Sequence, residues 1–382
     1  MKTCPGIGTA ICLWAALSLS GCAASRLPDP GPGQVQSWRM FGGDPDRRNA
    51  SAARPVPPLV QQWETDAGAG FGPASPALSD STIFVGTLTG EVRAVNLSTG
   101  DQTGSYDFGT AIFGTPLVFP GRMVVALSGD GENLVSYNLR TGAVQWSART
   151  GPVESSLLAA GGGILAVGLD GSLTKFDTAK GDEVWKYSPA DPSPSRSSPA
   201  TDGARVIFGT DRGTVIAVDL ATGRFAWEVR TGAAVFAAPA VYRGTAFIAS
   251  TDGSVYAIGT GTGVIAWKRP LGSPLYGSPA VDDGRVFVGT SGAEVVALGS
   301  ADGAVLWRTS VLGAVGSAPL VCGEYLYVGD LAKNLYALAS PTGETVWQAE
   351  TPGRVRCTPV AAPGRIIVLS EDRSIVGFRE QR

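Results

Sequence analysis

Few residue types in this 382-residue chain are suited to catalysis, which limits the chemistry to consider. The chain contains no histidine, which removes histidine-activated nucleophiles, histidine zinc sites and c-type haem attachment. Its acidic residues are scattered, mostly in turn sequences such as "TDG" and "EDR", where a carboxylate caps a hairpin by accepting backbone N–H groups. "STDG" and "GTDR" lack the run of oxygen ligands that a calcium loop needs. The sequence therefore predicts no catalytic residue and no metal site.

Tryptophan is the other residue type that could contribute to a functional site, because a flat indole can support a planar cofactor. Seven of the nine tryptophans recur at a regular spacing, six of them at the end of a "T-G-x-x-x-W"-like unit, in which Lys180 and Asp302 replace the threonine in two repeats. A residue that recurs with the period of the chain is more simply explained by packing in the core. We therefore predict a structural role for these tryptophans, which are Trp63, Trp146, Trp185, Trp227, Trp267, Trp307 and Trp347.

The tryptophans belong to a repeat of 40 to 42 residues. We align the repeats on one reference residue in each, which we call its anchor. Seven residues after each anchor a strand such as "IFVGT" begins. A second apolar strand follows a Gly or Asp-Gly turn, which is typical of a hairpin. A period near forty with one tryptophan per repeat is typical of a four-stranded propeller blade. The anchors are Pro76, Pro116, Leu157, Pro199, Pro239, Pro279, Pro319 and Pro359.

The two ends of the repeat array are irregular in a complementary way. The first repeat has Gly104 in place of the tryptophan, the last repeat has no closing unit, and Trp63 lies upstream of the first anchor. An open solenoid has no use for a missing strand at one end and a spare strand at the other. We therefore expect an all-β, eight-bladed β-propeller of four-stranded antiparallel blades, closed by an N-terminal strand that completes the C-terminal blade.

The N-terminus has the features of an export signal. Lys2 precedes a short apolar stretch, and "LSGC" resembles the bacterial lipobox, in which Cys22 becomes the lipid-modified first residue. A plain secretory signal with an incidental cysteine is the alternative. Because Ala23 follows the cysteine, we expect an outer membrane lipoprotein facing the periplasm, with the cell surface as the alternative. The expected organisation is a signal peptide (1–21), a lipidated cysteine and flexible tether (22–37), a lead-in segment (38–62) and the propeller (63–382).

Two cysteines remain in the propeller. Cys322 and Cys357 fall at different places in neighbouring repeats. An exported protein could oxidise them, but we expect two buried thiols packed as small hydrophobic groups.

The "T-G-x-x-x-W" unit resembles the repeat named for pyrroloquinoline quinone (PQQ), which occurs in quinoprotein alcohol dehydrogenases and in the BamB lipoproteins of the outer-membrane β-barrel assembly machinery. The resemblance covers Trp63 to Arg382, and "SWRMFGGDPDRRNAS" is similar to the lead-in of secreted members. It implies a PQQ-like propeller lipoprotein of the BamB-like kind. The dehydrogenases carry adjacent cysteines and are longer, whereas this chain has no adjacent cysteines. We therefore expect no cofactor and no enzymatic activity.

One set of positions varies between repeats while its neighbours do not. Three residues before each anchor, at the expected start of the innermost strand, the chain places residues that would ring one mouth of the central channel. Aromatic and arginine side chains are enriched in binding hot spots, although Glu154 and Arg196 could instead simply neutralise each other. The predicted partner-binding residues are Phe113, Glu154, Arg196, Phe236, Tyr276 and Arg356, with Pro73 and Gly316 completing the ring.

The BamB resemblance implies a partner-binding arginine before the fourth blade and an aspartate pair before the fifth. Arg196 matches the first partly, and "TGAAVFAAP" has no carboxylate for the second. The net charge of −3, with no run of one sign, indicates no nucleic-acid partner. We expect a monomeric, non-catalytic scaffold that binds a protein partner in the envelope and attaches to the membrane through Cys22. The alternatives are a receptor for a small ligand or glycan and, third, a PQQ-dependent dehydrogenase.

Overall fold

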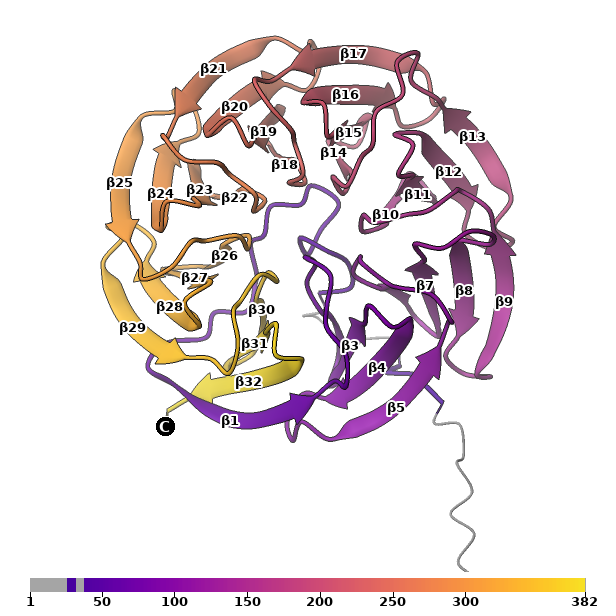
Figure 1. The fold of residues 1–382 in the computed structure, drawn as a ribbon, viewed down its shortest axis with the longest axis horizontal. Coiled ribbons are helices and arrows are strands. Elements are labelled where there is room, and N and C mark those ends of the chain that lie inside the picture. Colours follow the sequence, from indigo (N-terminus) through magenta and orange to yellow (C-terminus); the bar gives the residue numbers. More distant parts are fainter. Residues whose placement is uncertain (1–25, 32–37, 382) are drawn as a thin grey trace, which may run out of the picture.

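The protein is described by a computed structural model that covers residues 26–31 and 38–381. In this part of the chain, 32 strands form eight four-stranded antiparallel sheets arranged around a central channel (Figure 1). The predicted all-β, eight-bladed propeller is confirmed. The described residues form no helix of the length and apolarity needed to cross a membrane.

Blades 1 to 7 each consist of four consecutive strands, with the innermost strand first. Blades 1 and 2 contain β2 (Ala77–Ser79), β3 (Thr82–Gly86), β4 (Glu91–Asn96), β5 (Gln102–Asp107), β6 (Leu117–Phe119), β7 (Arg122–Ala126), β8 (Leu134–Asn138) and β9 (Ala143–Ala148). Blades 3 and 4 contain β10 (Leu158–Ala160), β11 (Gly163–Val167), β12 (Leu173–Asp177), β13 (Glu183–Tyr187), β14 (Ala200–Thr201), β15 (Arg205–Gly209), β16 (Thr214–Asp219) and β17 (Phe225–Arg230).

The remaining blades follow the same order, except that the last one borrows a strand. Blades 5 and 6 contain β18 (Ala240–Tyr242), β19 (Thr245–Ala249), β20 (Ser254–Gly259), β21 (Ile265–Pro270), β22 (Ala280–Asp282), β23 (Arg285–Gly289), β24 (Glu294–Gly299) and β25 (Val305–Ser310). Blades 7 and 8 contain β26 (Leu320–Cys322), β27 (Tyr325–Gly329), β28 (Asn334–Ala339), β29 (Thr345–Glu350), β30 (Val360–Ala362), β31 (Arg365–Leu369), β32 (Ser374–Glu380) and β1 (Leu59–Asp66).

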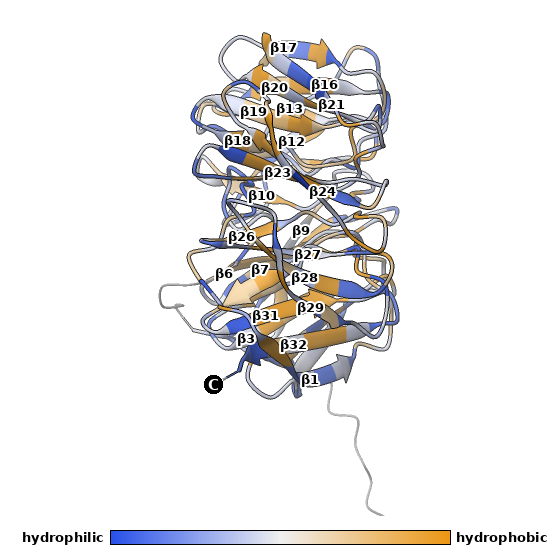
Figure 2. Ribbon diagram, turned by 90° about the vertical axis from the view of Figure 1, so that its left-hand side faces the viewer, coloured by the Kyte–Doolittle hydropathy of each residue, from blue (hydrophilic) through white to orange (hydrophobic). Residues whose placement is uncertain are grey.

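The burial of each strand follows from its distance to the channel. The second and third strands of a blade lie between neighbouring blades, so both of their faces are buried and they consist of near-continuous apolar runs, as in β15 and β16. The outer strand β17 alternates between exposed and buried residues. Figure 2 shows the propeller from the side, with apolar strands between polar turns.

The ring closes where the two ends of the propeller meet. β1 pairs antiparallel with β32, and Trp63 lies opposite Gly377 (Figure 1). The N-terminal strand therefore completes the C-terminal blade, as the irregular ends of the repeat array predicted. This pairing joins residues more than 300 positions apart, so hydrogen bonds and packing hold the ring shut without a short connecting turn.

The repeating tryptophans connect neighbouring blades. In six of them the indole Nε1 donates a hydrogen bond to a carbonyl oxygen of the next blade, and the ring covers a glycine with positive φ three residues after that carbonyl. A Cβ atom on any of these glycines would lie 2.4 to 2.8 Å from the ring, so only glycine fits. The sets are Trp63 with Leu97 and Gly100, Trp146 with Thr178 and Gly181, Trp185 with Leu220 and Gly223, Trp227 with Thr260 and Gly263, Trp267 with Ser300 and Gly303, and Trp307 with Ser340 and Gly343.

Trp347 lies at the junction of blades 7 and 8, where the repeat array ends. Its ring contacts Phe378 edge-on, with 5.8 Å between the ring centroids.

The lead-in segment runs around one end of the channel. Its carbonyl groups accept hydrogen bonds from the innermost strands of six blades, from Leu78 N–H to Trp38 at the start to Val321 N–H to Asn49 at the end. Arg47 is fully buried, and its guanidinium donates to the carbonyl oxygens of Leu157 and Pro199. The segment therefore connects blades that are far apart in the ring and covers this end of the channel.

The N-terminal boundaries differ from the sequence prediction in two places. β1 begins at Leu59, so the propeller starts before residue 63. Residues 26–31 lie within the expected flexible tether, yet Leu27 is fully buried against the first two blades, because an apolar slot is present there. Cys22 lies outside the described residues. Cys322 and Cys357 are both buried and unpaired.

Candidate functional site

The eight variable positions surround one pocket at the end of the channel that the lead-in leaves open. The pocket has a volume of about 590 Å³, and all eight residues line it. They lie in the loops that precede the innermost strands and not within those strands, which contain only two or three residues. We call this set the channel mouth, and it consists of Pro73, Phe113, Glu154, Arg196, Phe236, Tyr276, Gly316 and Arg356.

The pocket is closed at its inner end. Phe41 of the lead-in also lines it, and the ring packs in a buried cluster with Ala74 and Ala238. The lead-in bonds to the innermost strands around the opposite end of the channel, so Phe41 forms a floor of the pocket on that side. The predicted site does not include this aromatic floor, because the lead-in lies outside the repeats that define the channel.

Arg196 lies between two carboxylates on one side of the channel mouth. Its Nε is 2.9 Å from Oε2 of Glu154 on the neighbouring blade, and its Nη1 contacts the carboxylate of Asp211. Burial raises the pKa of Asp211, and Arg196 opposes this effect. The neutralisation of Glu154 by Arg196 that the sequence suggested is therefore present, with a second acid that the sequence analysis did not include.

Blade 8 has the opposite arrangement, with two arginines around one acid. Glu371 contacts Arg354 at 2.8 Å and Arg356 at 2.5 Å. The group around Arg196 has one excess negative charge and the group around Glu371 has one excess positive charge, when all members are ionised. The channel mouth therefore carries an excess negative charge at blades 3 and 4 and an excess positive charge at blade 8.

The predicted site does not include Asp211 and Glu371, because acidic residues in such turn sequences are expected to cap hairpins. Both lie twelve residues after the anchors of their blades, at Pro199 and Pro359. Among the eight repeats, this position is acidic only in the two whose variable position is arginine. That pairing within each repeat was a signal in the sequence that could have identified both acids.

Aromatic side chains occupy the mouth between these charged groups. Phe236 and Tyr276 on neighbouring blades stack with a centroid distance of 6.3 Å and an interplanar angle of 7°. Tyr276 is 50% exposed, so much of its ring is available for contact. Together with Phe113 these rings form an apolar contact surface at the opening.

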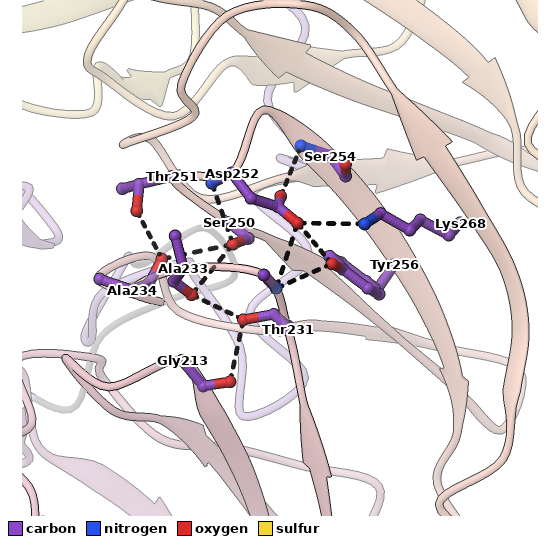
Figure 3. Close-up of polar contacts among 11 residues, drawn as sticks. Gly213, Thr231, Ala233, Ala234, Ser250, Thr251, Asp252, Ser254, Tyr256 and Lys268 are labelled. Carbon is purple, nitrogen blue, oxygen red and sulfur yellow. Dashed lines mark hydrogen bonds and ion pairs between the residues drawn. The ribbon is translucent and has the colours of Figure 1, made fainter.

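The loop that carries Phe236 is held by a polar network from blade 5 (Figure 3). Asp252 accepts hydrogen bonds from the hydroxyl of Tyr256 at 2.5 Å, from Nζ of Lys268 at 3.2 Å and from the N–H of Gly232 at 3.2 Å. Burial opposes ionisation of Asp252, but the bonds from Tyr256 and Lys268 hold its pKa below the ordinary value. The network fixes the loop four residues before Phe236 and so presents the ring in a defined position.

A similar network in blade 7 indicates that this role is structural. There Asp330 accepts hydrogen bonds from the hydroxyl of Tyr336 at 3.0 Å and from the N–H of Gly313 at 2.9 Å. The hydroxyl groups deeper in the pocket are also used by the scaffold, since Ser156 and Ser198 each accept a backbone N–H from the preceding blade. The chemistry that the pocket can offer to a ligand is therefore aromatic and charged.

The pocket does not fit a PQQ and metal site. Its carboxylates are Glu154, with Asp211 and Glu371 at the edge, and each of them already contacts an arginine. Among the described residues, no group of three or more histidine, cysteine or acidic side chains could hold a metal ion. We derive no catalytic step at this site.

Comparisons with known proteins agree with the repeat. The family model described as outer membrane protein assembly factor BamB matches residues 60–198, 169–275, 251–328 and 321–381. A BamB from Burkholderia pseudomallei is 29% identical over 185 residues, which covers 44% of this chain and 47% of that protein. The matched region therefore spans about half the length of this curated relative.

Solved structures share the fold with both classes that the repeat suggests. The structure of BamB from Moraxella catarrhalis superposes with a TM-score of 0.71 and 21% identity, covering 84% of this chain and 99% of that one. The quinohemoprotein alcohol dehydrogenase from Comamonas testosteroni has a TM-score of 0.77 and 13% identity, covering 92% and 82%. Likeness at this identity shows the fold alone, whereas the family model matches most of the chain. The chain belongs to the family of the outer membrane protein assembly factor BamB.

Proposed function

We propose that this protein is a non-catalytic envelope scaffold that takes part in outer-membrane protein assembly, attached to the membrane through a lipid on Cys22. Its partner is another protein, and the channel mouth is the surface that binds it. The observation that carries the proposal is the combination of two stacked aromatic rings, one half-buried and one exposed, with arginine–carboxylate groups around one opening. Membership of the BamB family is the reason for proposing outer-membrane protein assembly as the process.

The composition of the channel mouth supports a protein partner. Tyrosine, phenylalanine and arginine are enriched where protein interfaces gain most of their binding energy. The excess charges on opposite sides of the opening favour a partner segment with a basic group near Glu154 and an acidic group near Arg356. The network around Asp252 reduces the ordering that binding requires, because the loop before Phe236 is already fixed.

Crosslinking in intact envelopes tests the proposal. A photoreactive amino acid replaces Tyr276, and captured proteins are identified by mass spectrometry with and without Phe236→Ala or Arg196→Ala. We expect a component of β-barrel assembly to be captured, and each substitution to weaken capture by about 10-fold, as for hot-spot residues. Arg224→Ala, at an exposed position immediately before the outer strand of the same blade as Arg196, is the matched control and should leave capture unchanged.

Two outcomes would contradict the proposal. Equal capture by the wild-type chain and the Phe236→Ala variant would show that the mouth does not bind the partner. A large fall in the melting temperature of the Arg196→Ala variant would show a structural role, because this side chain is 46% exposed and substitutions at exposed sites usually change stability by no more than about 0.5 kcal/mol.

A second candidate, a receptor for a small ligand or glycan, is favoured by the closed inner end of the pocket. A pocket of about 590 Å³ with an aromatic floor has the size of many small-molecule sites. Native mass spectrometry of the protein with peptidoglycan fragments and oligosaccharides tests it. Retention that is lost in Phe41→Ala would support this candidate over the scaffold.

A further inference from the structure

One blade junction lacks the tryptophan that connects the others. In blade 1 the position is Gly104, opposite Ala94, which is the arrangement that Trp227 has opposite Ala217 in blade 4. The receiving side of the junction is nevertheless conserved in form. Blade 2 has Gly142 with a φ of +76°, and the carbonyl of Leu139 lies three residues before it, as at the six junctions that contain a tryptophan bond.

Arg26 makes both of the contacts that a tryptophan makes elsewhere. Its Nη2 and Nε donate to the carbonyl oxygen of Leu139 at 2.9 and 3.3 Å. Its side-chain stem covers Gly142, where a Cβ would lie 2.8 Å from Cδ of Arg26. The backbone of the same segment covers Gly104, where a Cβ would lie 2.2 Å from the carbonyl oxygen of Arg26. The segment therefore occupies the space that an indole at position 104 would need.

The residues that follow hold the segment in place. Leu27 is completely buried, with 0% solvent exposure, and it packs in a core cluster with Phe84, Tyr137 and Leu139. Asp29 pairs with Arg140 of blade 2 at 3.0 Å, and its other oxygen accepts the N–H of Gly31. Residues 26–31 are thus held by three kinds of contact: the burial of Leu27, the ion pair of Asp29, and the contacts of Arg26 that replace those of a tryptophan.

We propose that residues 26–31 form an N-terminal strap that replaces the missing tryptophan of blade 1 and binds in the slot between blades 1 and 2. The strap fixes the point at which the preceding chain leaves the propeller. Arg26 lies four positions after Cys22, and four extended residues reach at most about 14 Å. If the lipid anchor of the proposed function is present, the outer edge of blades 1 and 2 is therefore the part of the propeller held nearest to the membrane.

Stability and trypsin cleavage test the strap in the full-length protein, purified from membranes in detergent. Trypsin can cut after Arg26 only when Leu27 leaves its slot. We expect Leu27→Asp to lower the melting temperature by about 2–4 °C and to increase cleavage after Arg26 by about 10-fold or more. Val184→Asp introduces an aspartate in place of an apolar side chain that is 54% exposed, and it should alter neither quantity.

Restoring the tryptophan gives the decisive comparison. Gly104→Trp alone should displace the strap and expose Arg26 to trypsin. In the double variant Leu27→Asp with Gly104→Trp, the new indole should recover the lost melting temperature while Arg26 stays cleavable. Two results would overturn the strap: cleavage of the wild-type chain at the rate of the Leu27→Asp variant, or losses of melting temperature in the two single variants that add in the double variant.

A second measurement tests the orientation and separates it from the lipid anchor itself. Thr141 and Thr262 are equivalent exposed turn residues on blades 2 and 5, so each is changed to cysteine and labelled with a fluorophore. The protein is then bound to vesicles of phosphatidylethanolamine and phosphatidylglycerol that contain a headgroup-linked quencher. We expect stronger quenching at position 141 than at 262, and equal quenching in the Leu27→Asp background. Equal quenching in the wild-type background would overturn the orientation, whereas a failure to bind vesicles would contradict the anchor and leave the trypsin result to decide the strap.

Discussion

The closure of the ring predicts an unusual result for the substitution Gly377→Ala. Gly377 lies on β32 opposite Trp63, and in blades 4 to 7 the residue opposite the tryptophan is alanine, as with Ala217 and Trp227. A rule based on the repeat would therefore recommend alanine, and replacing a glycine whose conformation alanine can adopt usually stabilises by about 0.4–1 kcal/mol. The φ of Gly377 is not positive, so the backbone does not oppose the change.

Packing at the closure opposes the change. A Cβ on Gly377 would lie 2.2 Å from Cε2 of Trp63, which is far inside van der Waals contact. Trp63 is 8% exposed and bonds to the carbonyl of Leu97, so the ring has little room to move. Overpacking of this kind costs about 1–3 kcal/mol, and complete expulsion of the indole would approach the 3–5 kcal/mol or so of a tryptophan-to-alanine change. We expect a net loss of about 1–3 kcal/mol, because the overpacking exceeds the gain from glycine replacement.

Denaturant unfolding followed by tryptophan fluorescence and circular dichroism measures this loss. Trp63→Phe in the Gly377→Ala background should recover part of it relative to the additive expectation, because the smaller ring leaves space for the methyl group. A Gly377→Ala variant as stable as the wild-type chain would refute the reasoning, since it would show that Trp63 does not press against β32 at the closure.

Three further predictions concern groups buried in the propeller. Arg47→Leu should lower the free energy of unfolding by about 3–5 kcal/mol, because it leaves buried carbonyl groups without their donor; denaturant titration measures this, and a loss below 1 kcal/mol or so would contradict it. Trp227→Ala should cost about 3–5 kcal/mol by the same assay, because it opens a cavity and frees the carbonyl of Thr260. Burial raises the pKa of Cys357 to about 12 and that of Cys322 further, so the unfolded chain releases these protons near pH 9 while the folded chain keeps them. The free energy of unfolding should therefore fall as pH rises above 9, less steeply in Cys357→Ala, and an unchanged slope in that variant would argue against the buried thiol.

The repeating part of the fold could be predicted because the same pattern of strands and turns recurs in each blade. A strand such as β15 alone is an ambiguous apolar run, but eight such runs at one spacing identify a blade and its order in the ring. The position of the channel mouth followed from the same register, and all eight variable residues line the pocket. Partner binding by these residues could not be predicted from the register, because binding depends on the complementary surface of another molecule.

The parts that could not be predicted occur once in the chain. Residues 26–31 have the Pro, Gly and polar composition of a linker, and only the slot at Gly104 gives Leu27 a place to be buried. Arg47 sits in a lead-in with no periodicity, and its carbonyl partners lie 110 and 152 residues away. Composition and periodicity are local properties, so they carry no information about contacts of this kind.

These single-copy elements share one property that explains their place in the sequence. The ring has three defects: an outer strand is missing from blade 8, a tryptophan is missing from blade 1, and one end of the channel is open in a ring of bare blades. β1 fills the first, residues 26–31 fill the second, and the lead-in around Arg47 fills the third. All three come from the described residues before Ala67. An irregularity in a repeat array is thus best examined together with the non-repeating segment beside it, because each buried vacancy in the array has to be filled by residues that do not follow the period.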